Sequence, residues 1–261
     1  MPARAAAGPL AALLLASAAL LTACTPPQVE RAHARFREPP PRTGDPRGAH
    51  PVPQPEPHPV PKPEAVTGFP PSAAVARDRL ARLEVAWGRN WQTYRREEFG
   101  RTWSDEVDVP GGRNGCDTRD DVLRRDLADL REGDRNPCVV LSGTLDDPYT
   151  GKRLPYHYRR ASQIETDHVV ALGAAWRAGA WAWTPQQRLN YANDLDVLLA
   201  VDKQANADKS SKTPDKWQPR QAYHCAYARR WTGIKAKYRL TVTPPEQQAL
   251  LGMLAECPKE P

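Results

Sequence analysis

Histidine and cysteine are scarce in this sequence of 261 residues, which contains six histidines and five cysteines. No two cysteines have the C-x-x-C spacing, so a zinc site built from cysteines is not expected. The motif G-x-x-x-x-G-K-[ST] is also missing, and the chain shows no P-loop for a nucleotide cofactor. Basic residues outnumber acidic ones, 37 to 31, which gives a net charge of +6. This balance suits nucleic acid, an anionic membrane surface or a cell-wall polymer as partner, or it serves solubility alone.

The first residues have the composition of a targeting segment. Residues 5–21 are almost entirely apolar, and Leu21-Thr22-Ala23-Cys24 follows. This tetrapeptide resembles the lipobox of bacterial lipoproteins, which implies cleavage before Cys24 and attachment of lipid to its thiol. An apolar run of this length alternatively remains in the membrane as an anchor. We predict a lipoprotein signal peptide at 1–23 and an exported chain, anchored to the outer face of the cytoplasmic membrane or secreted.

Residues 24–71 are dominated by proline, which stands at every second position from Pro51 to Pro63. Such a composition forms neither a helix nor a packed core, so it predicts a disordered, extended spacer. Its three histidines are expected to be solvated. We place the globular domain at 72–261.

Four cysteines remain for an exported domain, Cys116, Cys138, Cys225 and Cys257. Disulfides form outside the cytoplasm, and four cysteines allow three pairings. The sequence does not choose among them; we favour the two local pairs, Cys116–Cys138 and Cys225–Cys257.

Hydrophobic periodicity predicts a mixed order of helices and strands. An apolar repeat from Ala76 to Trp87 indicates a helix, and Asp117-Thr118 begins a second one with Leu127 and Leu130 on its apolar face. Thr184-Pro185 has the pattern of an N-cap followed by proline in the first turn. Strands are expected at 138–145, 153–158, about 163–168 and 196–201. A short helix is expected at 202–208 and longer ones at 219–237 and 244–256.

Only three histidines fall within 72–261: His157, His168 and His224. His168 follows Asp167 at the end of a predicted strand. Asn193 comes just before the next strand, and Asn206 and Lys209 lie on the helix that follows it. This order of Asp-His, Asn and Asn-Lys resembles the His–Asn–His (HNH) endonucleases, including the HNH domain of RNA-guided CRISPR nucleases.

The resemblance is closer to the HNH family that shares the C-terminal domain of GmrSD-type restriction enzymes, from about Tyr94 to Cys257. Its secreted members have segments like those at 114–121, 142–145, 147–151 and 167–172. The resemblance implies an α+β fold with a ββα-metal (His-Me finger) core, embedded in additional helices and a β-hairpin.

The same resemblance implies a role for each residue of the motif. His168 would deprotonate the attacking water, Asp167 and Asn206 would bind a divalent ion, Asn193 would position the imidazole or the hairpin, and Lys209 would meet the substrate phosphate. Asn206 stands where the family name has its third histidine. Oxygen ligands favour Mg²⁺ or Mn²⁺ over Zn²⁺. Glu165 lies on the same strand face as Asp167, either near the ion or, the favoured interpretation, as an exposed residue.

The region from Asp202 to Arg239 holds ten lysines and arginines against three aspartates, a composition that suits phosphate contacts or a solvated helix face. Lys212 and Arg119 are further candidates for binding nucleic acid. His157 and His224 are expected to be structural. The tryptophans either stack on unpaired bases or, more simply, fill the core: Trp176, Trp181, Trp183, Trp217 and Trp231.

The leading hypothesis is a monomeric metal-dependent endonuclease that cleaves DNA, with RNA as another possible substrate and no nucleotide cofactor. A catalytically inactive, surface-anchored binder of DNA or of an anionic wall polymer is the alternative. A secreted toxin domain is a third hypothesis, which the lipobox and spacer disfavour because they suit retention.

Overall fold

Two small antiparallel sheets and a set of helices make up residues 68–258, the part of the chain that the computed structural model describes. The α-helices are α1 (Ala73–Arg82), α2 (Thr118–Asp126), α3 (Leu172–Arg177), α4 (Pro185–Ala192), α5 (Lys203–Lys209), α6 (His224–Lys237) and α7 (Pro244–Ala255). The strands are β1 (Leu127–Glu132), β2 (Val140–Asp146), β3 (Arg153–His157), β4 (Ile164–His168) and β5 (Leu198–Asp202). The predicted signal peptide, the lipobox and nearly all of the predicted spacer lie outside the described residues.

The first sheet has the strand order β1-β2-β3, with both pairs antiparallel. Its first strand corrects a prediction, because Leu127–Glu132 was expected to continue the preceding helix. Helix α2 instead ends at Asp126, whose carboxylate accepts hydrogen bonds from Arg125 and from the backbone N–H of Ala200 in β5. The chain then pairs with β2, and Leu127 lies opposite Leu145.

The second sheet consists of β4 and β5, which are antiparallel, and α5 packs against both strands. Successive side chains of a strand point to opposite faces. Leu198 and Ala200 join one hydrophobic cluster with α2 and the first sheet, whereas Leu199 and Val201 join a second cluster with the helices. All of β5 is therefore buried, which explains its continuous apolar run.

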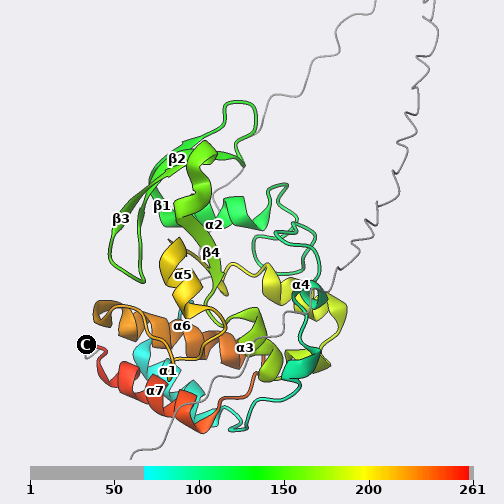
Figure 1. Cartoon of the computed structure of the whole chain (residues 1–261), viewed down its shortest axis with the longest axis vertical. Helices are drawn as coiled ribbons and strands as arrows, with labels where there is room; N and C mark the ends of the chain where they lie inside the picture. The colour runs from blue at the N-terminus through cyan, green and yellow to red at the C-terminus, as the bar shows by residue number, and fades with distance from the viewer. Residues whose placement is uncertain (1–67, 259–261) are drawn as a thin grey trace, which may run out of the picture. The chain divides into compact units, whose positions relative to one another are not determined.

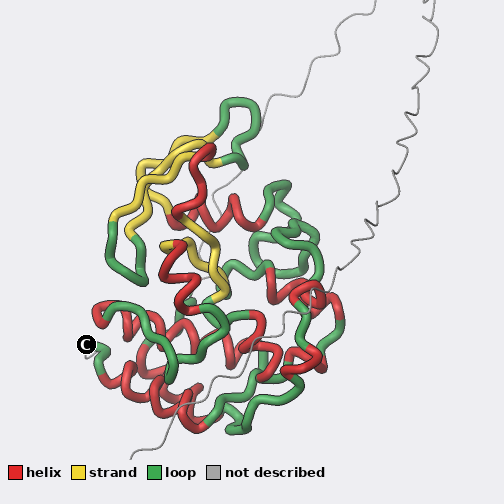
Figure 2. The backbone as a smooth tube through the Cα atoms, in the orientation of Figure 1, coloured by secondary structure: helices red, strands yellow, loops and turns green. Residues whose placement is uncertain are grey.

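The helices α1, α6 and α7 pack together beside this pair of strands. Figure 1 shows them gathered at the bottom of the view, with α5 and β4 between them and the first sheet. In Figure 2 the strands, drawn in yellow, occupy the opposite half from these helices. The architecture is α+β, and the strands β4 and β5 lie between its two hydrophobic clusters.

The start of helix α4 was predicted correctly from its local sequence. The Thr184 hydroxyl accepts from the backbone N–H of Gln187, the Gln187 side chain accepts from the backbone N–H of Thr184, and Pro185 occupies the first turn. The first helix, by contrast, ends at Arg82, so Trp87 is not part of it and is exposed.

The four domain cysteines form two disulfides. Cys116 is bonded to Cys138 and Cys225 to Cys257, the two local pairs favoured from the sequence. The first joins the start of α2 to the segment before β2, and the second joins α6 to the end of α7. Within residues 68–258, no helix is both long and apolar enough to cross a membrane.

Candidate active site

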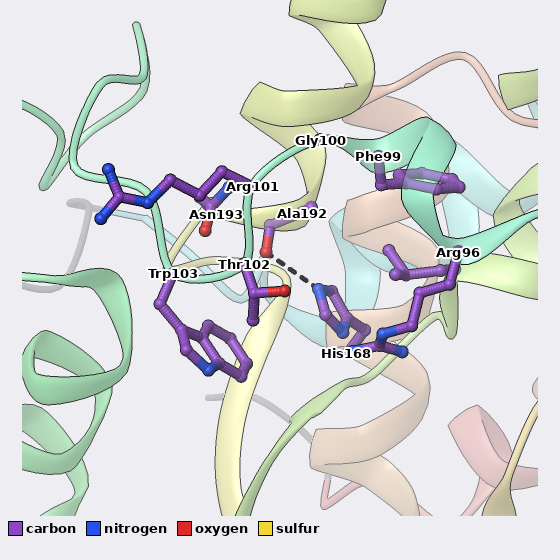
Figure 3. Close-up of a pocket in the computed structure, with 10 residues that line it drawn as sticks. Arg96, Phe99, Gly100, Arg101, Thr102, Trp103, His168, Ala192 and Asn193 are labelled. Carbon is purple, nitrogen blue, oxygen red and sulfur yellow. Dashed lines mark hydrogen bonds between the residues drawn. The ribbon is translucent and has the colours of Figure 1, made fainter. Parts of the chain in front are cut away.

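The His168 imidazole at the end of β4 is buried and held by a backbone carbonyl. Its Nε2 lies 2.9 Å from the carbonyl oxygen of Ala192, the last residue of α4 (Figure 3). The Trp103 ring stacks on the imidazole, with 6.2 Å between the centroids and 12° between the planes. A carbonyl oxygen only accepts, so Nε2 carries the proton and Nδ1 carries the lone pair.

Asn193 fixes this arrangement from one residue further along. Its side-chain oxygen accepts from the backbone N–H of Ser104 at 3.0 Å, and its amide nitrogen donates to the carbonyl of Leu189 at 2.9 Å. The side chain is almost fully buried. Asn193 therefore ties the end of α4 to the loop that carries Trp103, and it positions both groups that contact the imidazole.

A small cavity of ≈ 20 Å³ lies beside His168 (Figure 3), enough for about one water molecule. Arg96 and Arg101 are exposed residues that line it. Neither guanidinium has a hydrogen-bond or ion-pair partner within residues 68–258. The cavity thus places a water-sized space next to an imidazole and two free positive charges at its edge.

The electrostatic surroundings keep His168 neutral. Burial above all, together with the positive charges of Arg96 and Lys209, lowers the pKa of the imidazole to about 3, although the hydrogen bond to Ala192 opposes the shift. The ring therefore has an unprotonated Nδ1 at neutral pH. Within residues 68–258 no hydrogen-bond partner faces this nitrogen.

The Asp167 carboxylate points to the other side of β4, where it is buried in an ion pair. Its Oδ1 accepts from Nζ of Lys209 at 2.9 Å, and its Oδ2 accepts from the hydroxyl of Tyr149 at 2.6 Å. Lys209 also donates to the backbone carbonyl of His168 at 2.9 Å. Burial raises the pKa of Asp167, and the lysine and tyrosine oppose that shift. Lys209 is fully enclosed, so a contact between its ammonium and a substrate phosphate requires this pair to open.

A second polar pair lies beside the first. The side-chain amide of Asn206 donates to Oε2 of Glu165 at 2.9 Å, and both residues are half-buried. Glu165 and Asp167 share one face of β4, and Asn206 and Lys209 are three residues apart on α5. The favoured interpretation of Glu165 as an exposed strand residue is therefore wrong. Asp167 and Asn206, the two expected metal ligands, are hydrogen-bonded to different residues, Asp167 to Lys209 and Asn206 to Glu165.

The oxygen atoms of this region are suited to a hard divalent ion. The amide oxygen of Asn206 and Oε1 of Glu165 have no hydrogen-bond partner within residues 68–258. Oxygen donors of this kind are those that Mg²⁺ and Mn²⁺ prefer. No group of three or more His, Cys, Asp or Glu side chains converges on a metal position within the same residues, so a site here needs a donor of another kind, and the Asn206 amide oxygen is one.

The remaining candidates lie elsewhere. Lys212 is exposed just beyond α5, and its ammonium donates to the carbonyl of Asp208. Arg119 is half-buried on α2, which packs beside the first sheet. His157 is exposed at the end of β3. His224 lies 3.1 Å from the carbonyl of Pro219 and from the carboxylate of Glu256, in keeping with a structural role.

Three parts of the site were missed from the sequence: Tyr149, Trp103 and the arginines at the cavity. Tyr149 belongs to the Asp147–Gly151 turn, where Asp147 accepts hydrogen bonds from Thr150 and from the backbone of Asp202. The resemblance included the segment 147–151, but no role was assigned to Tyr149. No local pattern distinguishes Trp103 or Arg96, which reach His168 through the loop packing.

Comparisons with known proteins place the chain in a family. Residues 117–253 match the family described as GmrSD restriction endonucleases, C-terminal domain. The chain is also similar to an uncharacterized secreted protein of Arthroderma benhamiae, with 37% identity over 190 residues, which covers 72% of this chain and 87% of the relative. No solved structure matches the chain.

Proposed function

Because the chain belongs to the family of the C-terminal domain of GmrSD restriction endonucleases, we propose that it is a metal-dependent endonuclease that hydrolyses phosphodiester bonds of DNA. The observation that carries this proposal is the placement of His168. A neutral imidazole is anchored through Nε2, and it lines a water-sized cavity with two unpaired arginines. A purely structural histidine does not need these charges.

His168 would act as the general base. Nδ1 takes a proton from a water molecule, the water oxygen attacks the phosphorus atom, and the bond from phosphorus to the leaving 3′-oxygen breaks. That oxygen then takes a proton from solvent. A base positioned in this way contributes about 10²–10⁴-fold to a rate. Ala192 and Asn193 keep the ring oriented, and Arg96 and Arg101 attract the phosphate to the cavity.

The strands β4 and β5 followed by α5 would form the ββα unit of an HNH nuclease. Within it, Glu165 and Asn206 would hold a divalent ion, and Asp167 would join them on release from Lys209. A bound ion of this kind stabilises negative charge on the phosphate and on the leaving oxygen. Mg²⁺ or Mn²⁺ is favoured over Zn²⁺ because every one of these donors is an oxygen.

Purified protein with both disulfides formed should convert supercoiled plasmid to open-circular and linear forms when Mg²⁺ or Mn²⁺ is added. A chelator should abolish this cleavage, because the bound ion would stabilise the negative charge on the leaving oxygen. Gel analysis of the products against time measures the effect. Absence of cleavage with any divalent ion, while salt-sensitive DNA binding persists, would favour the inactive surface-anchored binder.

Export and a lipid anchor form the second part of the proposal. The similar fungal protein carries the description secreted, which supports export, and Cys24 in Leu21–Cys24 would take the lipid. When the protein is produced in a bacterium, the wild type should sediment with the membranes, and the Cys24→Ser variant should not. Immunoblots of the membrane and soluble fractions test this. Equal membrane retention of the variant would show that the apolar segment itself is the anchor.

A further inference from the structure

A groove of ≈ 170 Å³ lies at the C-terminal end of α3, apart from the cavity at His168. Two tryptophans, Trp87 and Trp181, and two arginines, Arg89 and Arg177, line it, and Glu84 is the only acidic residue among its lining. The groove is formed by the loop after α1, the end of α3 and the short 3₁₀ helix η4 (Ala180–Ala182).

The two tryptophans are exposed to an unusual degree for their type. Trp87 is 68% exposed and Trp181 is 42% exposed, whereas Trp176 and Trp231 are buried in the core. Tryptophan usually buries most of its large surface, so two exposed indoles lining one groove leave apolar faces available to a ligand. Most of the tryptophans were expected to fill the core, and Trp181 is an exception.

The charges in the groove favour an anion. The Arg89 guanidinium has no hydrogen-bond or ion-pair partner within residues 68–258. Arg177 is held by the carbonyl of Ser211, at 2.7 Å, and stacks over the ring of Trp91, with 4.9 Å between its Cζ and the ring centroid. One positive charge that is held in place and a second without a partner among the described residues, at a groove lined by exposed indoles, suit a phosphate chain whose bases stack.

Helix α3 connects the groove to the candidate active site. Its first residue, Leu172, lines the cavity at His168, and its last, Arg177, lines the groove. Five steps of 1.5 Å place these residues about 8 Å apart along the helix axis, so the cavity and the groove lie at the two ends of one short helix. Trp91 lies next to this helix, but its ring is already in contact with the protein, because it stacks on Tyr94 with 5.2 Å between the centroids and lies under the Arg177 guanidinium.

We propose that this groove binds an unpaired segment of the nucleic-acid strand that is cleaved at His168. The inference rests on the proposed nuclease function and adds a preference for single-stranded or unwound substrate. Indole rings stack on any exposed base, whereas the bases inside a duplex are already covered by their neighbours. The arginines select a polyanion over a neutral glycan, which also stacks on tryptophan.

The test separates binding from cleavage. Titrations use the full chain carrying His168→Ala, in chelator, with labelled oligo(dT) and with a duplex of equal length. Adding Trp87→Ala and Trp181→Ala should weaken oligo(dT) binding by at least about tenfold, since each stacked base contributes about 1–3 kcal/mol, and change duplex binding by less than about twofold. Trp87→Phe with Trp181→Phe should restore most of the loss. Leu251→Ala, another exposed apolar residue, is the control and should have no effect.

Equal losses for both nucleic acids, or no loss, would overturn the proposal, as would tryptophan-dependent binding of a soluble chitooligosaccharide in place of oligo(dT). Failure of the nuclease proposal has a different signature. If the wild-type protein cleaves nothing but still binds oligo(dT) through these tryptophans, the groove proposal stands and the nuclease proposal is wrong. If cleavage is normal and the tryptophan substitutions do not change binding, only the groove proposal is wrong.

Discussion

His168→Ala should lower the rate of plasmid cleavage by about 10²-fold or more, as expected when a positioned general base is lost. Among the described side chains that line the ≈ 20 Å³ cavity, the imidazole is the one that can take a proton from water, since the arginines there are already protonated. The rate is measured from initial velocities at saturating divalent ion. Undiminished cleavage would remove His168 from the mechanism.

Loss of activity through misfolding must be distinguished from loss of the base. His168 is buried and bonded to the Ala192 carbonyl, so the alanine variant also loses a hydrogen bond and some packing. His168→Gln provides an amide that can donate to the same carbonyl but cannot accept a proton. It should be as inactive as the alanine variant and more stable to heat. His157→Ala removes an exposed histidine on β3 and should cleave at the wild-type rate.

The order of elements around this histidine could be predicted because the signals are local. A capping residue and a proline define the start of α4, and an apolar run defines β5. The end of α2 could not be predicted in this way. Leu127–Glu132 has residues that suit a helix face, but pairing with β2 and the bond from Asp126 to β5 outweigh that preference. Those contacts join distant parts of the sequence.

In the candidate site, too, local patterns could be predicted from the sequence and long-range contacts could not. Asp167-His168 and the two asparagines were identified from their order along the chain, and the structure gives each a buried or half-buried place. The partners were not identified, because they depend on packing. Asp167 pairs with Lys209, and Asn206 pairs with Glu165. The two residues that were expected to bind one ion together are therefore hydrogen-bonded to two different partners. A sequence pattern states which groups are near, but not which atoms are paired.

Lys209→Met should lower the melting temperature in chelator by roughly 10 °C. Lys209 is fully buried and its partner, Asp167, is 6% exposed. Removing one partner of a buried ion pair leaves an uncompensated charge and costs about 3–5 kcal/mol. In a domain of this size, each kcal/mol shifts the melting temperature by about 2–4 °C. Differential scanning calorimetry measures the shift.

The response of this variant to divalent ions tests whether Asp167 is a ligand. If an ion binds at Asp167 and Asn206, it replaces the missing positive charge, and Mg²⁺ or Mn²⁺ should raise the melting temperature of Lys209→Met more than that of the wild type. In the wild type, by contrast, the ion must first displace the ammonium.

Lys235→Met is the matched control. Lys235 and Glu246 are also buried, with 2.6 Å between Nζ and Oε1, but they lie on α6 and α7, outside the site residues on β4 and α5. Both methionine variants lose a buried cation, so both should be destabilised in chelator. Only Lys209→Met should regain stability with the ion. In that variant the unpaired carboxylate of Asp167 has the amide oxygen of Asn206 and the carboxylate of Glu165 nearby. An equal response of the two variants would mean that Asp167 takes no part in binding the ion, leaving Glu165 and Asn206 as the protein ligands to be tested.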